Sequence, residues 1–573
     1  MEYRIHHTII TWYTRVMITS RAARLRLLVP ALTTGALLLT GCTGQPATNG
    51  VDPALQAADG APATAAPTTG TKAATTGAAT GAGKPTGADD PALTSFYGQR
   101  IGWAACPAAR NENLDTSGLE CGKLHVPLDY AHPETGALDI ALVRLPAAEP
   151  DRKLGSLVVN PGGPGGSGLE FVEGSRKDFA GALHNRFDVV GFDPRGIGQS
   201  SPVSCLTDAQ RDALDQIDSP TDAKARRAQS DQQNQEYATA CQAGSGKLLP
   251  FVGTRNTARD VDVLRQALGD RKLNYLGISY GTYLGALYAE EFPQNTGRLV
   301  LDGAVDPAAD PLDENIGQLA GFEKSLRAFA ADCVRNHAAE CPLGTDPDTA
   351  AQKADAFLDS LHEHPLPTAD GRKVNRDLAQ LGTIAFLYGD EKTTWPILRL
   401  AFSAGVEEKT GDRFLMGADA YNGRDEKGHY SSQEDAHTAI SCADGAAPAP
   451  SPERIQQVLA KLKEQAPMFS KDTAAEDFAV ASCAAWPFHT AETPHTVRAE
   501  GSAPILVIGT TGDPATPYAA AESLAKGFAH ATLLTREGEG HGAFGAGNAC
   551  IDLALKLYLI DGTMPAAGTR CAN

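Results

Sequence analysis

One serine in this chain lies in a sequence typical of an enzymatic nucleophile. The pentapeptide Gly277-Ile278-Ser279-Tyr280-Gly281 follows an apolar run, 274–278, that predicts the end of a buried strand, and it precedes a stretch, 282–292, with helical apolar spacing. A strand-to-helix turn crowds the backbone, and glycines on both sides remove the side chains that would clash. We therefore expect Ser279 to expose its hydroxyl for attack on a carbonyl carbon; an ordinary glycine-flanked turn is the alternative.

Two residues near the C-terminus could move the proton of that serine. The run 504–509 predicts a buried strand followed by the loop of Asp513, and the run 531–535 predicts a strand that leads into the glycine-rich loop of His541. Acid and then histidine is the chain order expected after a nucleophile in such a turn. We expect His541 to act as general base and acid while Asp513 fixes its tautomer. A neighbouring strand could supply the acid instead.

A glycine-rich loop could stabilise the negative charge that develops during the attack. The run 155–159 predicts a short strand that leads into Asn160-Pro-Gly-Gly-Pro-Gly-Gly-Ser-Gly168, a loop with five glycines. Such a backbone can aim N–H groups at a ligand, and we expect Gly163 and Tyr280 to supply the two donors of an oxyanion hole. A merely flexible turn is the alternative.

A second loop, after the predicted strand that begins at Phe187, carries Asp193 and Arg195 among glycines. Both side chains could take part in catalysis. An ion pair that stabilises the loop is the role that we expect.

The elements that must position these residues indicate an α/β fold with a mostly parallel sheet. The next predicted strand, 298–303, is separated from the strand at 504–509 by far more chain than one crossover needs. Helical periodicity at 315–331 and 452–464 predicts a mainly helical cap inserted between the nucleophile strand and the acid strand. A cap restricts access, so we expect small molecules or chain ends as substrates.

The N-terminus predicts export. Three arginines, Arg21, Arg24 and Arg26, precede a 13-residue apolar stretch, 27–39, which is short for a membrane span of about 20 residues but suits a signal peptide. The stretch ends in Leu39-Thr-Gly-Cys42, which resembles a bacterial lipobox that leaves Cys42 carrying lipid. Plain secretory cleavage is the alternative. Met17 could be the true start.

The segment after Cys42 is rich in alanine, threonine, glycine and proline and cannot bury enough apolar surface to fold. The predicted organisation is a signal peptide (1–42), a disordered linker (43–92), the first part of the core (93–306), the cap (307–497) and the C-terminal part of the core (498–573).

Cysteines and charge narrow the possible compartments and partners. Of 11 cysteines, the lipidated Cys42 leaves ten, an even number that favours disulfides in an exported protein. Pairing of neighbours predicts Cys106 with Cys121, Cys205 with Cys241, Cys333 with Cys341, Cys442 with Cys483, and Cys550 with Cys571. The sequence holds no typical metal-ligand spacing, and we expect neither a metal nor another cofactor. A net charge of −19 argues against nucleic acid as a partner and leaves the lipid anchor as the expected link to the membrane.

Several motifs together resemble those of the secreted bacterial tripeptidyl aminopeptidases, which are α/β-hydrolases related to prolyl aminopeptidases. They are Asn160-Pro-Gly-Gly-Pro-Gly, Asp193-Pro-Arg-Gly-Ile-Gly-Gln-Ser, Gly277-Ile-Ser-Tyr-Gly-Thr-Tyr-Leu-Gly, Thr511-Gly-Asp-Pro-Ala-Thr-Pro and Gly540-His-Gly. The resemblance implies release of tripeptides, or other short units, from free N-termini. It also carries the nucleophile to Ser279, the acid to Asp513 and the proton shuttle to His541. Prolyl aminopeptidases have a histidine where Pro161 stands, so their preference for a single proline is not expected here.

An aminopeptidase also needs a carboxylate for the ammonium group of its substrate, because burying that cation without a partner costs free energy. The candidates are Glu170, Glu434, Asp435 and Asp444, although each could simply be a solvated surface charge. The leading hypothesis is a surface-anchored serine exopeptidase, or one secreted and released. A carboxylic ester hydrolase with the same catalytic residues and a solute-binding surface lipoprotein are the alternatives.

Overall fold

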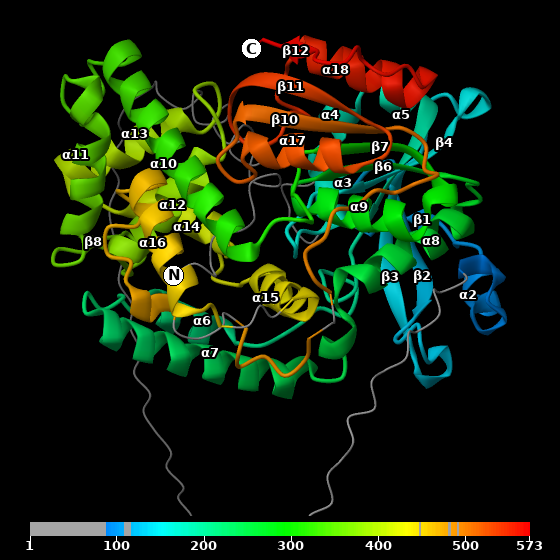
Figure 1. The fold of residues 1–573 in the computed structure, drawn as a ribbon, viewed down its shortest axis with the longest axis horizontal. Helices are drawn as coiled ribbons and strands as arrows, with labels where there is room; N and C mark the ends of the chain where they lie inside the picture. The colour runs from blue at the N-terminus through cyan, green and yellow to red at the C-terminus, as the bar shows by residue number, and fades with distance from the viewer. Residues whose placement is uncertain (1–86, 108–115, 446–448, 479–482, 490–491, 573) are drawn as a thin grey trace, which may run out of the picture. The chain divides into compact units, whose positions relative to one another are not determined.

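The structure, a computed structural model, describes residues 87–107, 116–445, 449–478, 483–489 and 492–572. These residues build a ten-stranded sheet in the order β1-β2-β3-β5-β4-β6-β7-β10-β11-β12 (Figure 1). The strands are β1 (Ala104–Ala105), β2 (Glu120–Pro127), β3 (Ala137–Leu145), β4 (Gly155–Asn160), β5 (Phe187–Phe192), β6 (Leu273–Ile278), β7 (Thr296–Asp302), β10 (Ile505–Gly512), β11 (Ala531–Glu539) and β12 (Arg570–Cys571). The strands from β5 to β12 pair in parallel, and β1 to β3 add an antiparallel edge.

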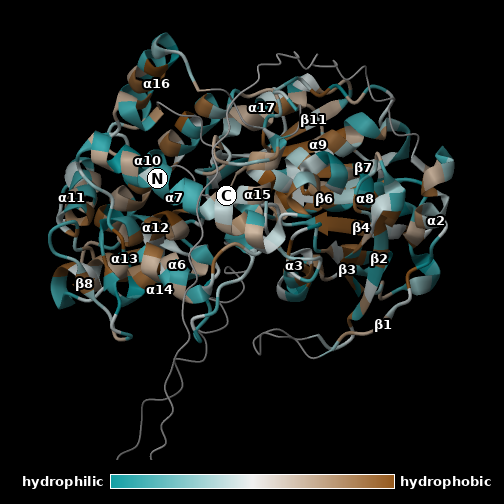
Figure 2. Ribbon diagram, turned by 90° about the horizontal axis from the view of Figure 1, so that it is seen from below, coloured by the Kyte–Doolittle hydropathy of each residue, from teal (hydrophilic) through white to brown (hydrophobic). Residues whose placement is uncertain are grey.

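The parallel strands are continuous apolar runs because helices cover both faces of the sheet. Leu157 and Val159 of β4 face the cluster that includes α3 (Gly168–Gly174) and α18 (Ala549–Lys556), whereas Val158 faces α8 (Thr254–Leu268) and α9 (Tyr280–Glu291). Figure 2 shows the central strands as the most hydrophobic part of this region. The predicted α/β fold with a mostly parallel sheet is confirmed.

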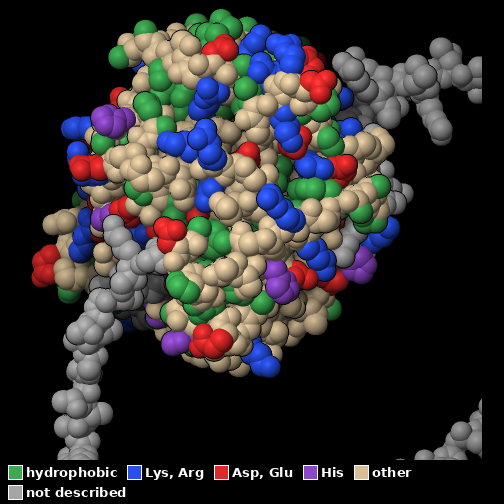
Figure 3. All heavy atoms as spheres, turned by 90° about the vertical axis from the view of Figure 1, so that its right-hand side faces the viewer, with side chains coloured by type: hydrophobic (Ala, Val, Ile, Leu, Met, Phe, Trp, Pro, Cys, Tyr) green, Lys and Arg blue, Asp and Glu red, His purple; other side chains and the backbone are tan. Residues whose placement is uncertain are grey.

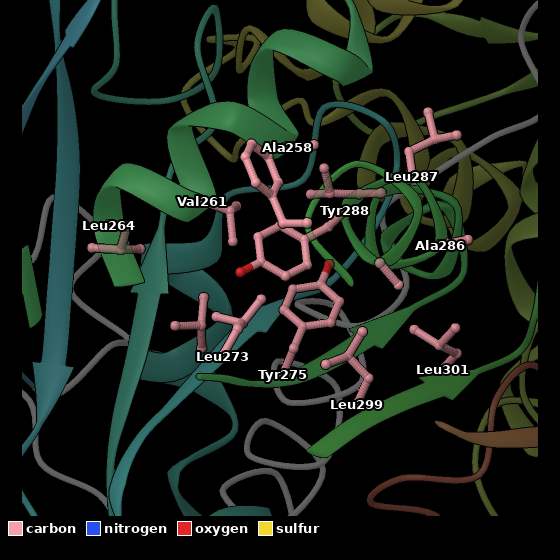
Figure 4. Packing of buried hydrophobic residues seen from close by; sticks show 14 of the residues in the cluster. Ala258, Val261, Leu264, Leu273, Tyr275, Ala286, Leu287, Tyr288, Leu299 and Leu301 are labelled. Carbon is pink, nitrogen blue, oxygen red and sulfur yellow. The ribbon is translucent and has the colours of Figure 1, made fainter. Parts of the chain in front are cut away.

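The packing between α8, α9 and the sheet supports the turn of the expected nucleophile. Tyr275 of β6 and Tyr288 of α9 lie together among aliphatic side chains (Figure 4). The Tyr275 hydroxyl donates to the carbonyl oxygen of Gly281 at 2.8 Å, and the Tyr288 hydroxyl donates to Asp262 at 3.0 Å. The first hydrogen bond ties the start of α9 to the strand that precedes it.

A group of helices lies between β7 and β10 and forms the cap (Figure 1). They are α10 (Pro311–Asn336), α11 (Pro347–Ser360), α12 (Arg376–Leu387), α13 (Trp395–Ser403), α14 (Asp412–Asn422), α15 (Gln433–Asp444) and α16 (Pro452–Gln465), with a small hairpin of β8 (Leu366–Pro367) and β9 (Lys373–Val374). Helices α10 to α14 share a hydrophobic cluster of their own. The cap therefore has a core separate from those on the two faces of the sheet.

A second segment joins the cap from an earlier part of the chain. Helices α6 (Asp208–Asp215) and α7 (Ala223–Ser245) precede β6, and α7 runs beneath the cap in Figure 1. Asn422 donates to Asp215 at 3.2 Å, and Arg226 pairs with Asp477 at 2.8 Å. This segment was predicted to belong to the first part of the core (93–306), but its polar contacts attach it to the cap.

The described chain begins before the predicted start of the core. Residues 87–89 and 91–93 form short 3-10 helices, and Gly87 is buried near Tyr97 and Phe292. The predicted linker, which was to end at residue 92, is thus wrong for residues 87–92: they form short helices, and Gly87 is buried against the core. The predicted signal peptide, Cys42 and the remainder of the predicted linker lie outside the described residues.

The predicted strands and both predicted cap helices are present, and all five predicted disulfides form. Within the described ranges, the helices are too short or too polar to cross a bilayer.

The surface carries charges of both signs. Lys and Arg side chains on the face seen in Figure 3 stand among acidic ones.

Candidate active site

Ser279 lies at the sharp turn between β6 and α9 and has φ 58° and ψ −127°. Its N–H donates to the carbonyl oxygen of Asp302 at 2.9 Å. A Cβ on Gly281 would stand 2.8 Å from the carbonyl oxygen of Asn160, and one on Gly277 would overlap the carbonyl of Gly281. Glycine is therefore required on both sides of the serine by the close approach of backbone atoms, as the sequence analysis expected.

His541 and Asp513 form a buried hydrogen-bonded pair. The Nδ1 atom of His541 lies 2.9 and 3.0 Å from the two carboxylate oxygens of Asp513. The same carboxylate accepts the N–H groups of Ala515, Thr516 and Gly542 at 2.9 to 3.1 Å. These donors fix the orientation of Asp513, and its contact with Nδ1 leaves the Nε2 atom of the ring to face another group.

Asp302, at the end of the neighbouring strand β7, is a second acid that could have bound the imidazole ring of His541 in place of Asp513. Its carboxylate accepts the N–H groups of Ala543 at 2.9 Å and of Phe544 at 2.7 Å. It thus binds the backbone that follows His541, whereas Asp513 binds the imidazole ring. Asp302 was not identified from the sequence, although an acid at the end of the predicted strand 298–303 was a usable signal.

The histidine loop and the serine turn flank the same dipeptide, Asp302-Gly303. The Asp302 carbonyl binds the N–H of Ser279, and a Cβ on Gly303 would stand 3.2 Å from the Cε1 atom of His541. Gly303 has φ +64°, a conformation that favours glycine. The absence of a side chain at Gly303 lets the imidazole ring lie next to the strand end beside Ser279.

Two acids raise the pKa of His541. Burial disfavours the charged ring, but the charge and hydrogen bonds of Asp513, followed by the charge of Asp302, outweigh it and place the pKa above the usual value of 6.5. Burial likewise raises the pKa of Asp302, against the hydrogen bonds from Phe544 and Ala543.

Thr516 also contacts this pair and was not identified from the sequence. Its hydroxyl donates to Asp513 at 3.0 Å and lies 3.2 Å from the Nδ1 atom of His541. Its position three residues after Asp513 in a turn was the available signal.

The glycine loop lies directly against the serine turn. A Cβ on Gly162 would stand 3.0 Å from the Cβ of Ser279 and 3.1 Å from the backbone nitrogen of Tyr280. The N–H of Gly162 donates within the loop, to Asn160 Oδ1 at 2.9 Å. Among the described residues, the N–H groups of Gly163 and Tyr280 have no protein acceptor, so both remain available to a ligand.

Asp193 and Arg195 do not contact each other. Arg195 forms a bidentate pair with Asp260 of α8 at 2.6 and 2.7 Å, and it donates to the carbonyls of Pro127, Leu128 and Phe251. Asp193 instead accepts Ser167 Oγ at 2.5 Å and the N–H of Gln199 at 2.7 Å. The expected ion pair between Asp193 and Arg195 is therefore wrong: Arg195 pairs with Asp260, because the turn of the loop sends the two side chains to different elements.

The four candidate carboxylates for an ammonium group lie in different surroundings. Asp435 pairs with Arg211 and accepts Tyr237 at 2.6 Å and the N–H of Cys205 at 2.8 Å, so its oxygens are occupied. Asp444 accepts the N–H of Thr254 at 2.6 Å and also its hydroxyl; burial raises its pKa to about 7. These two acids attach α15 to α7 and α8.

Glu170 is exposed in the first turn of α3, whereas Glu434 is half-buried in the first turn of α15. Helix α15 lies over the glycine loop, since His437 Nδ1 is 3.3 Å from the carbonyl oxygen of Pro164. Glu434 is one turn before His437 and lies close enough to Tyr421 to raise the pKa of its phenol, after burial and Tyr388. Glu434 is thus on the helix that covers the glycine loop, and Glu170 is on the helix that follows this loop.

The cap also contacts the histidine loop through Tyr388. The N–H of His541 donates to the carbonyl oxygen of Tyr388 at 2.7 Å, and the two rings pack edge to face with centroids 5.4 Å apart. Nearby, Arg536 bridges the carbonyl of Gly542 and the carboxylate of Asp390, each at 3.1 Å. The cap thus braces the loop that carries His541, a contact that the sequence analysis did not foresee.

In the part of the chain that the structure describes, no cluster of three or more histidine, cysteine or acidic side chains could hold a metal ion.

The sequence is similar to those of several known proteins. A profile of the α/β hydrolase fold matches residues 155–547. The chain is 39% identical over 483 residues to serine protease Hip1 of Mycobacterium tuberculosis, which covers 83% of this chain and 91% of that protein. It is 36% identical over 473 residues to carboxylesterase B of the same species (82% of this chain, 89% of that protein). It is 33% identical over 482 residues to tripeptidyl aminopeptidase of Streptomyces lividans (82% and 86%).

Proposed function

Because the chain belongs to the α/β-hydrolase fold family and, within it, to the tripeptidyl aminopeptidase-like serine peptidases, we propose that it is an exported exopeptidase. It releases short peptides, and tripeptides in particular, from substrates with a free N-terminus. The observation that carries the proposal is the arrangement of Ser279 and the His541–Asp513 pair on either side of Asp302-Gly303.

The chemistry follows from which atoms are free. Ser279 Oγ attacks the carbonyl carbon of the scissile peptide while His541 Nε2 takes the hydroxyl proton, because Nδ1 is held by Asp513. The N–H groups of Gly163 and Tyr280 stabilise the oxyanion. His541 then gives the proton to the leaving amine, which departs and leaves an acyl-enzyme. Water, deprotonated by His541, attacks the ester carbon; the bond to Ser279 Oγ breaks, His541 returns the proton to this oxygen, and the short peptide is released.

Exopeptidase specificity is supported by the cap. Helix α15 lies over the glycine loop, and α10 and the chain after α12 approach the loops of Asp513 and His541. A protein chain cannot pass through a site covered in this way as easily as a chain end can enter it. Among the four acids predicted from the sequence, Glu434 remains a candidate for the substrate ammonium group.

Export is supported by the five disulfides, which form and persist in oxidising compartments. Lipid attachment at Cys42 holds the enzyme at the outer face of the cell membrane; release after plain secretory cleavage is the alternative.

A carboxylic ester hydrolase is the second candidate. The similarity to carboxylesterase B supports it, and the same serine chemistry cleaves esters and amides. A solute-binding lipoprotein would need neither the strained serine turn nor the buried His541–Asp513 pair.

The deciding experiment compares three substrates on the full chain, produced in an exporting bacterial host. These are a tripeptidyl chromogenic amide, its N-acetylated twin and a simple aryl ester. Preference for the free amine supports the exopeptidase, whereas equal or ester-favoured cleavage assigns the chain to the esterases. Labelling by a serine-directed organophosphonate, abolished in Ser279→Ala, separates either enzyme from a binding protein, which would take up no label.

A further inference from the structure

The first long helix of the cap, α10, has two different faces. Leu312, Ile316 and Leu319 pack on α16 in a small apolar cluster. Gly317, Gln318, Gly321 and Ser325 lie three, four, seven and eleven residues after Glu314 and share the opposite face with it.

That opposite face runs along the catalytic loops. Gln318 Nε2 donates to the carbonyl oxygen of Ala515 at 2.9 Å, and a Cβ on Gly321 would stand 2.5 Å from the carbonyl oxygen of Pro514. Further along, Ser325 donates to the carbonyl of Leu387, next to the residue that binds the N–H of His541, at 3.3 Å. Glu314 lies one turn before Gln318, about 6 Å along the helix axis, just beyond the loop of Asp513.

Glu314 has no cationic partner among the described residues, unlike its neighbour. Asp313 points to α16, where Lys461 and Arg454 pair with it at 2.6 and 2.9 Å. The charge near Glu314 is instead the negative one of Asp306, and burial followed by that charge raises the pKa of Glu314 to about 7. Glu314 nevertheless stays exposed to solvent, so a ligand can reach its carboxylate.

Tyr283 is the residue near the nucleophile on which the charge of Glu314 acts. It lies in the first turns of α9, which begins directly after Ser279, and Glu314 is among the acids that raise the pKa of its phenol, after burial, Asp444 and Glu492. Glu314 on α10 thus lies close enough to α9 for its charge to act on Tyr283, four residues after the nucleophile.

We infer that the carboxylate of Glu314 binds the N-terminal ammonium group of the peptide whose carbonyl carbon Ser279 attacks. This assignment rests on the proposed function and adds a residue to it. An ammonium group supplies the countercharge that the protein itself does not place beside Glu314. A blocked N-terminus offers no such charge.

The test compares Glu314→Gln with wild type on the free tripeptidyl amide, its N-acetylated twin and the aryl ester. We expect kcat/KM for the free amine to fall about 10- to 100-fold, the range for a lost hydrogen bond to a charged group, with the ester unchanged. The thermal midpoint should stay equal or rise, because the substitution removes a desolvated charge. Asp313→Asn is the matched control, on the same helix but the other face, and should keep the preference for the free amine.

Three results would overturn the assignment. If Glu314→Gln keeps the preference while Glu434→Gln loses it, the ammonium group binds at α15 and the proposed exopeptidase stands. If Glu314→Gln loses ester and amide activity together, Glu314 is structural. If wild type shows no preference for the free amine, the proposed function fails together with the inference. Should Glu314→Gln not fold, Glu314→Asp replaces it: a retained preference with a raised KM supports the assignment, and an unchanged KM contradicts it.

Discussion

The sheet side and the cap side of the site are built by different means. On the sheet side, backbone geometry places the groups: the positive φ of Ser279, the missing side chains at Gly277 and Gly281, and the donors that surround Asp513. On the cap side, individual side chains and ion pairs do so, such as Asp435 with Arg211. Backbone geometry tolerates little change, whereas a side-chain surface can be altered residue by residue. The sheet side is therefore suited to the chemistry and the cap side to the choice of substrate.

The largest effect should come from the sheet side, through Ser279→Ala. We expect kcat to fall about a millionfold for amide and ester alike, as for other triad serines. Thermal unfolding should not change, because alanine fills the same backbone position and the hydroxyl is not part of the core. Substantial activity in this variant would show that the strained turn does not carry the nucleophile.

The next largest effect distinguishes the roles of the two acids at the ends of β7 and β10, Asp302 and Asp513. Asp513→Asn should lower kcat about 10,000-fold, because the amide favours the wrong imidazole tautomer. Asp302→Asn should mainly lower stability, by about 1.5–3 kcal/mol, since Asp302 accepts backbone N–H groups and not the ring. Steady-state kinetics and urea unfolding measure both. An equal or greater loss of kcat in Asp302→Asn would make Asp302 the functional acid.

Substitution of one buried arginine in the core and one at the cap compares how much each region contributes to the free energy of unfolding. Arg195→Met should cost about 3–5 kcal/mol, because it leaves the buried carboxylate of Asp260 without a cation and with the Tyr130 hydroxyl as its remaining side-chain donor. Arg211→Met should cost less, since Arg211 is 10% exposed against 0% for Arg195, and Asp435 keeps Tyr237 and the N–H of Cys205.

Urea unfolding of the two arginine variants is followed by tryptophan fluorescence, with Trp395 in the cap and Trp103 beside the antiparallel edge of the sheet. A larger cost for Arg211→Met would mean that the cap, and not the core, sets the stability of the chain.

The difference between the sheet side and the cap side also explains which features could be predicted from the sequence. Short apolar runs predicted β4, β6 and β10, because strands buried on both faces must be continuously apolar. The residues that act at the strand ends follow directly from the positions of those strands. Ser279, Asp513 and His541 could thus be named, whereas the roles assigned to them stay proposals.

The cap was less predictable because its contacts are distant in sequence and polar. Helix α7 has 23 residues, of which only Ala238 and Cys241 are buried, so it shows no apolar periodicity. The partners of Arg195 and His541, Asp260 and Tyr388, are 65 and 153 positions away in the chain. Glu314 could not be distinguished from Asp313 until the fold showed which of them lacks a cation.

The smallest predicted effect is a shift in the pH profile of activity, which can be compared between a variant on the sheet side and a variant in the cap. His541 must be neutral to accept the proton of Ser279, so activity rises with pH through its pKa, which the acids raise above 6.5. We expect the acid limb of kcat/KM for the aryl ester to have its midpoint above pH 6.5. A group with a raised folded pKa stabilises the fold below its unfolded pKa, and this contribution is lost as pH rises through the folded value.

Activity and the His541 contribution to stability should therefore change in opposite directions across the same interval. In Asp513→Asn the charge that raises the pKa is lost, so the acid limb of the residual activity should move to lower pH, while Asp313→Asn in the cap should leave it in place. An acid limb that stays fixed in Asp513→Asn would mean that a group other than His541 controls it, and that the pair on the sheet side is not the proton shuttle.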